Sequence, residues 1–291
     1  MSPSLKTFMI SLLTAIVVVI IMLRFYGPSS STPALETKKA ETTFERIART
    51  GVIRCGYGTW PPYLMKDPNT GQLSGMNYEV MEAIGRNLEL KIEWTEEVGW
   101  GNYIEGINTK RYDMFCASVW PNGPRTKNTT LSKPTFYSAA YALARIDDHR
   151  FDGDLSKVND PAVKISVIEG DYTESLAKED YPKASRNVLS PNSDGAQVLL
   201  EIASGKADIA FADLGLFREF EKNNPGKLTL VPNTPPSRIF GEHLSVGLGE
   251  FELKNALDTA ITTLSNSGVI AKIIKQYQGG STYAPAPDFA Q

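Results

Sequence analysis

Short apolar runs alternate with amphipathic segments along most of the chain, and the two kinds recur in a regular order. The apolar runs end at glycine or polar residues, which is typical of buried strands, and the amphipathic segments repeat apolar residues at helical spacing. In the first part, strands are predicted at 51–57, 90–94 and 112–119, and helices at 76–88 and 103–109. This alternation predicts a parallel sheet with helices on both faces.

The same pattern starts again after residue 160. Strands are predicted at 163–168, 187–189 and 207–212, and helices at 173–179, 196–204 and 250–277, the last interrupted at Gly268. The 291 residues suffice for two domains of ordinary size. Two α/β units in succession therefore predict two lobes.

The N-terminal segment is a membrane signal. Residues 8–23 are uncharged, Lys6 precedes them and Arg24 follows at once. Such a run is short for a membrane span but long for the core of a cleaved signal peptide. Residues 1–26 fit either a cleaved signal or an uncleaved anchor. Because no clear small-residue cleavage motif follows, we predict an anchor at residues 8–26, with the remainder exported to the outer face of the membrane.

Two further segments lack the pattern of a folded core. Residues 27–43 are rich in Ser, Thr, Pro and charge, and residues 279–291 end in YAPAPDFAQ, with two prolines. We predict a flexible tether and a flexible tail.

Charge and the scarcity of cysteine and histidine exclude several functions. Lys and Arg total 30 and Asp and Glu total 33, a formal net charge of −3 that lacks the basic excess of nucleic-acid-binding proteins. Two cysteines and two histidines, without ligand spacing, argue against a disulfide scaffold, a zinc site and a Ser-His-Asp triad. No metal or other cofactor is expected.

A series of short motifs from about Phe44 to Gln278 resembles the bacterial extracellular solute-binding proteins of family 3, the polar amino-acid type. The matching runs, in order, are RCGYGTWPPY at 54–63, SGMNYE at 74–79, KRYD at 110–113, PR at 124–125, LSKP at 131–134, and the aspartates at 208 and 213. The order and spacing of these runs cover more than three-quarters of the chain.

The resemblance implies a two-lobed α/β clamshell of the periplasmic-binding-protein type II class, preceded by the apolar segment. Lobe one would comprise residues 44–142 and 245–278, and lobe two residues 146–240. Crossover segments at 137–146 and 237–248 would form the hinge, and hinge closure would trap a ligand between the lobes.

The resemblance also implies a site for a zwitterion. Arg125 matches the arginine whose planar fork binds the ligand's carboxylate, and Asp213 matches the aspartate that holds its ammonium group. Two plainer interpretations stay open: Arg125 as a loop arginine and Asp213 as the cap of the following helix. Trp60 and Trp100 match aromatic walls, although each could be a core residue.

Three other positions are assigned through the same resemblance. Ser118 lies at a strand end where the family uses hydroxyl and backbone groups, or it is a buried strand serine. Trp120 departs from the usual Ser or Gly. Asp171 and Tyr172 replace the usual Thr-Thr at the start of the helix in lobe two, and Thr173 could supply the missing hydroxyl. These departures predict an altered pocket.

Together these features predict a monomeric binding protein, not an enzyme, that captures an amino-acid-like solute and delivers it to ABC permease subunits. The alternative is an enzyme on the same fold, similar to cyclohexadienyl dehydratases, which would need an acid such as Glu97, Asp171 or Asp213 as proton donor. Cys55 and Cys116 lie in strands that the family places side by side. We expect buried thiols there, with a disulfide as the less favoured alternative.

Overall fold

The computed structural model describes residues 3–26, 41–277 and 282–283. The chain separates into two compact units, Met1–Glu41 and Thr42–Gln291. Most of the predicted tether and tail lies outside the described residues.

The first unit contains helix α1, Pro3–Tyr26, whose apolar side chains between Met9 and Leu23 are exposed. No helix in the described ranges combines the length and the hydropathy needed to cross a membrane. The anchor predicted at residues 8–26 stays a prediction.

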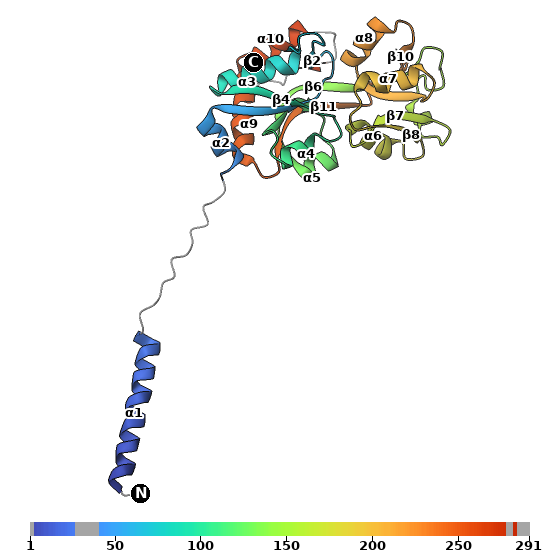
Figure 1. Cartoon of the computed structure of the whole chain (residues 1–291). Coiled ribbons are helices and arrows are strands. Elements are labelled where there is room, and N and C mark those ends of the chain that lie inside the picture. Colours follow the sequence, from blue (N-terminus) through green and yellow to red (C-terminus); the bar gives the residue numbers. More distant parts are fainter. Residues whose placement is uncertain (1–2, 27–40, 278–281, 284–291) are drawn as a thin grey trace. The chain divides into compact units, whose positions relative to one another are not determined.

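The second unit consists of two α/β halves (Figure 1). In the first half, the parallel strands β1 (Val52–Tyr57), β4 (Lys91–Glu97) and β5 (Met114–Val119) are joined by helices, with β1 between the other two. The other elements of this half are α2 (Thr43–Thr50), α3 (Met76–Asn87), α4 (Tyr103–Asn108), α5 (Gly123–Asn128) and a small hairpin of β2 (Met65–Lys66) and β3 (Leu73–Ser74). The predicted strand–helix order of this part is confirmed.

The second half repeats the arrangement with strands β7 (Lys164–Ile168), β8 (Ser185–Leu189) and β9 (Ile209–Asp213). Strand β7 pairs in parallel with both of the others. Its other elements are η1 (Leu155–Val158), α6 (Tyr172–Asp180), α7 (Gly195–Ala203), α8 (Leu214–Asn223) and β10 (Leu228–Leu230). Strand β7 ends at a turn through Gly170, whose φ of 73° is in the left-handed region that favours glycine.

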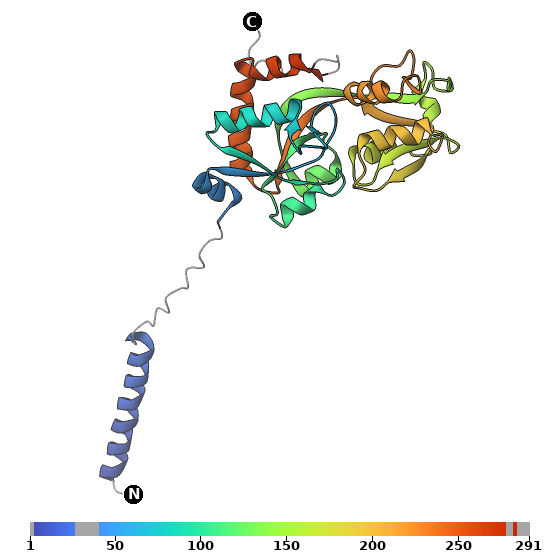
Figure 2. The same cartoon turned by 45° about the horizontal axis from the view of Figure 1, so that its top comes forward.

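Two long antiparallel strands, β6 (Thr129–Arg145) and β11 (Arg238–Gly247), connect the halves. Strand β11 pairs with β5 in the first half, and β6 pairs with β9 in the second. After β11 the chain returns to the first half as α9 (Phe251–Asn266) and α10 (Val269–Gln276), which pack against α3 (Figure 2). A two-residue strand, β12 (Thr282–Tyr283), pairs with β6. The predicted lobe and hinge boundaries stay a prediction.

Each half has its own apolar core. In the first half, Ile53, Met81 and Leu257 are among fully buried residues contributed by strands, α3 and α9. In the second half, Ile165 and Ile209 lie in one buried cluster, and a further cluster lies beneath α7 and α8. Separate cores allow the halves to move as bodies about the two connecting strands.

The two cysteines form a disulfide across neighbouring strands β1 and β5, with the Cα atoms of Cys55 and Cys116 5.4 Å apart. The expectation of free buried thiols is therefore wrong. That expectation used strand adjacency alone, whereas the register brings the two Cα atoms within the distance that a disulfide spans.

Loss of this disulfide should destabilise the protein. It links residues 61 apart in sequence, so releasing it should lower the free energy of unfolding by about 4 kcal/mol. Urea unfolding of a Cys55→Ala/Cys116→Ala variant should show this loss, and the wild type with excess reductant should show a similar one. Equal stability of oxidised wild type and variant, or two alkylatable thiols in the native protein, would contradict the assignment.

Candidate functional site

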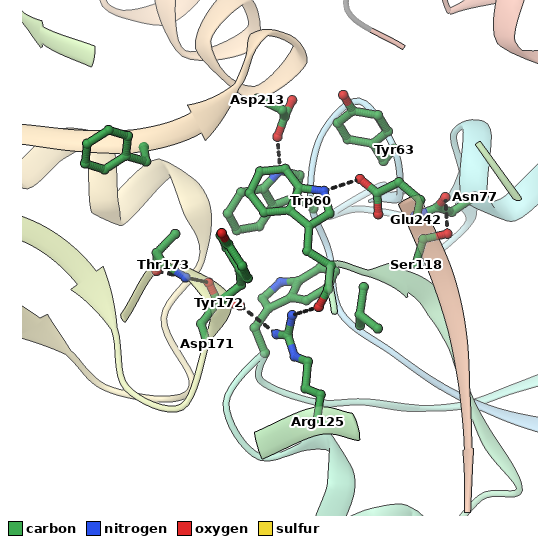
Figure 3. A pocket seen from close by; sticks show the side chains of 14 residues that line it. Trp60, Tyr63, Asn77, Ser118, Arg125, Asp171, Tyr172, Thr173, Asp213 and Glu242 are labelled. Atoms are coloured by element: carbon green, nitrogen blue, oxygen red, sulfur yellow. Dashed lines mark hydrogen bonds and ion pairs between the residues drawn. The ribbon is translucent and has the colours of Figure 1, made fainter. Parts of the chain in front are cut away.

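A cavity of about 50 Å³ lies between the two halves and is lined by residues of both (Figure 3). All eight residues that the sequence predicted to bind ligand line it: Trp60, Trp100, Ser118, Trp120, Arg125, Tyr172, Thr173 and Asp213. The structure adds six residues that were not on that list: Tyr63, Asn77, Val119, Asp171, Phe211 and Glu242. The structure thus brings residues distant in sequence into one site.

Arg125 lies on the short helix α5, where the Asn122 side chain accepts a hydrogen bond from the Arg125 amide at 2.8 Å. The residue is only 2% exposed and is therefore not a loop arginine in solvent. One terminal nitrogen, Nη2, donates to Asp171 Oδ2 at 2.7 Å, and the other, Nη1, donates to the Trp120 carbonyl at 2.8 Å. Arg125 therefore has a carboxylate partner from the opposite half of the protein.

Asp171 occupies the N-cap of α6, directly after the turn that ends β7. Its Oδ1 accepts hydrogen bonds from both the amide and the hydroxyl of Thr173, each at 3.0 Å, and Oδ2 accepts from Arg125. The Thr173 hydroxyl thus has an acceptor within the protein, and its predicted role toward a ligand carboxylate stays a prediction. Asp171 stands where the family usually has a threonine, so this position supplies a carboxylate and lacks the usual hydroxyl.

Asp213 ends β9 and is 2% exposed. Its Oδ1 accepts from the Leu216 amide at 2.8 Å and so caps α8, while Oδ2 accepts from Trp60 Nε1 at 2.7 Å. The two interpretations of this residue are therefore compatible, since it both caps a helix and lines the cavity. Burial raises the pKa of this carboxyl above its ordinary value, against the effect of these hydrogen bonds.

Glu242, on β11, is a buried acid that the sequence analysis missed. Its Oε1 accepts from Trp120 Nε1 and from Ser138 Oγ, both at 2.6 Å. Burial raises its pKa to about 7, and the nearby Asp213 acts in the same direction, whereas Arg125 opposes the shift. The sequence did contain a signal for this residue, because Glu242 is the single acid within the otherwise mostly apolar strand 238–247.

Aromatic rings form much of the remaining wall. Trp60 and Trp100 meet edge to face with centroids 5.4 Å apart, and Trp120 meets Tyr172 in the same way at 5.3 Å. Phe211 from β9 also lines the cavity. Such rings can pack against apolar parts of a ligand or stabilise a cation over their faces.

Two of the predicted residues are also tied into the first half. Ser118 Oγ donates to Asn77 Oδ1 at 3.1 Å, so its hydroxyl has a buried protein partner. Trp100 Nε1 donates to the Thr59 carbonyl at 3.2 Å. Glu97, considered above as a proton donor, is outside this cavity and forms an ion pair with Lys66 at 2.8 Å.

The chain belongs to the family described as bacterial extracellular solute-binding proteins, family 3, whose sequence profile matches residues 53–280. The family resemblance predicted from short motifs is confirmed. Members of this family act outside the cytoplasm.

Among curated proteins, the chain is similar to the L-cystine-binding protein TcyA of Bacillus subtilis (strain 168), with 24% identity over 90% of this chain and 94% of that protein. It is 22% identical to the L-arginine-binding protein of Pseudomonas aeruginosa (strain PAO1) over 79% of this chain and 89% of that protein.

Among solved structures, the fold resembles that of the ancestral amino acid-binding protein AncCDT-1, described as a precursor of cyclohexadienyl dehydratase. The TM-score is 0.69 at 23% identity, covering 81% of this chain and 99% of that one. The likeness establishes the α/β fold of the periplasmic-binding-protein type II class, as predicted.

Stability should depend on pH through Glu242. Its pKa is raised to about 7 in the folded protein, so the folded state holds a proton that the unfolded state releases from about pH 4.5 upward. The contribution of Glu242 to stability is therefore complete at low pH and is lost as the pH rises toward 7. Over this range the free energy of unfolding should fall by about 3 kcal/mol from this group.

Chemical unfolding at pH 5 and pH 8 should show a smaller loss for Glu242→Gln than for the wild type. The exposed Glu252→Gln on α9 is the matched control and should behave as the wild type. An unchanged pH slope in Glu242→Gln would refute a raised pKa at this position.

Proposed function

We propose that this protein is a solute-binding protein that captures a small amino-acid-like solute outside the cytoplasmic membrane, for delivery to an ABC transporter. The observation that carries the proposal is the cavity between the two halves, where a guanidinium, carboxyl groups and aromatic rings converge. The binding activities named for the cystine- and arginine-binding relatives support the same class of ligand.

The arrangement of strands suits capture by closure. Strands β6 and β11 connect the halves, and the predicted hinge segments, 137–146 and 237–248, lie largely within them. Ligand contacts from both halves, such as Trp60 on one side and Asp213 on the other, would stabilise the closed arrangement. We propose that a monomer in this closed arrangement is recognised by the permease subunits.

Replacing Asp213 should weaken solute binding. Asp213→Asn keeps an oxygen to accept from the Leu216 amide but removes the charge that would face a ligand's ammonium group. The dissociation constant should therefore rise about tenfold or more.

Isothermal titration calorimetry against amino acids and amines measures this change. Asp160→Asn, at an exposed aspartate of the second half, should leave affinity unchanged. The proposal fails if no amino acid or amine binds the wild type, and the role of Asp213 fails if its variant binds as tightly as the control.

A second candidate is a dehydratase that acts on arogenate or prephenate. It is favoured by one observation: Glu242 is a carboxyl group in the cavity whose burial raises its pKa to about 7, a value suited to proton donation at neutral pH. Absorbance of phenylpyruvate, or detection of phenylalanine, formed from these substrates distinguishes an enzyme from a binding protein. Product formation lost in Glu242→Gln would establish catalysis, and no product would exclude it.

A further inference from the structure

The guanidinium that a ligand's carboxylate would need is already neutralised within the protein. Both terminal nitrogens of Arg125 have acceptors, Asp171 Oδ2 and the Trp120 carbonyl. The Arg125 and Asp171 side chains are only 3% and 10% exposed. A charged hydrogen bond in such a place is strong, and breaking it leaves the buried Asp171 carboxylate without a countercharge. A ligand carboxylate could therefore bind both terminal nitrogens only by displacing their present acceptors, Asp171 among them.

The charges around the cavity favour a cation instead. In the described part of the chain, the charged side chains that line it are Arg125, Asp171, Asp213 and Glu242. After Arg125 and Asp171 neutralise each other, two carboxyl groups remain. Figure 3 shows Asp213 and Glu242 on the side of the cavity away from Arg125.

The hydrogen-bond donors to these two carboxyl groups are neutral. Trp60 Nε1 and the Leu216 amide donate to Asp213, and Trp120 Nε1 and Ser138 Oγ donate to Glu242. Neutral donors orient a carboxylate but do not balance its charge. A cationic ligand would supply the missing countercharge, and its binding would be favoured by the low dielectric of the buried site.

The walls suit the apolar part of such a ligand. Trp60, Trp100, Trp120, Tyr172 and Phe211 all line the cavity. Aromatic faces attract organic cations, with Trp the most effective, and the attraction is greater where water is excluded. Aromatic faces beside two carboxyl groups are a typical combination for an ammonium or guanidinium group.

From these observations we propose that the ligand is an organic cation without an α-carboxylate, and that Asp171 is the residue that determines this specificity. In this arrangement Asp171 takes the position of the ligand's carboxylate on Arg125, while Asp213, Glu242 and the indole rings hold the cation. The inference rests on the proposed solute-binding function and narrows its substrate class from amino acids to amines, guanidines or quaternary ammonium compounds.

Pairs of compounds that differ only in the carboxylate test this specificity. We would titrate the full chain with agmatine and L-arginine, with histamine and L-histidine, and with choline. The decarboxylated member of at least one pair, or choline, should bind about tenfold or more tightly than either amino acid, because Asp171 already balances the Arg125 charge that an amino-acid carboxylate would need.

Asp171→Thr should reverse the preference. The substitution frees the Arg125 guanidinium and restores a hydroxyl at the helix start, so affinity for the amino acid should rise about tenfold or more while that for the amine falls or stays constant. Asp171→Asn, which keeps the shape and removes the charge, should shift in the same direction. Asp147→Asn, at an exposed aspartate of the second half, is the matched control. Thermal unfolding of each variant verifies that it is folded.

The outcomes separate this inference from the function on which it rests. Tighter binding of L-arginine or L-histidine by the wild type, unimproved in Asp171→Thr, overturns the inference and leaves the solute-binding function standing. No binding of any of these compounds at millimolar concentration overturns both. Preferential binding of an amine or choline that Asp171→Thr abolishes or reverses supports the inference.

Discussion

The ion pair between Arg125 and Asp171 joins the two halves of the protein at the wall of the cavity that lies between them. A guanidinium that is almost fully buried requires a partner, because an isolated buried charge costs several kcal/mol. Here the partner comes from the other half, at the start of α6, and it is itself held by Thr173. The pair therefore contributes to closure in the same place where relatives of this fold are expected to hold a ligand's carboxylate.

A second contact across the halves, from the Trp60 indole to Asp213, lies on the side of the cavity away from the first (Figure 3) and uses the other charged position predicted for a zwitterion. Together the two contacts pair the Arg125 guanidinium and the Asp213 carboxyl with the protein's own groups. What remains open to a ligand is set by the aromatic walls and by the carboxyl groups of Asp213 and Glu242.

Much of this architecture follows from local pattern. A run such as Met114–Val119, buried at every position, predicts its strand from composition alone, and the order of such runs predicts two α/β halves. The site residues could be predicted only through a family resemblance, which located Arg125 and Asp213. It could not show that Asp171, 46 residues away from Arg125, would bind it, because that depends on how the halves close. Glu242 was missed because its burial depends on the register of β11 against β6, and the disulfide was missed because strand adjacency does not define the distance between two Cα atoms.

The route of the chain has a consequence for the order in which the protein can be completed. The core of the first half includes residues from α9 and α10, so this half lacks part of its interior until the end of the chain has emerged from the ribosome or the export channel. The second half is formed from one continuous stretch between β6 and β11. It is synthesised later than β1, but it can reach its full set of contacts before the first half does. During that interval the bond between Cys55 and Cys116 can hold two neighbouring strands of the unfinished half together.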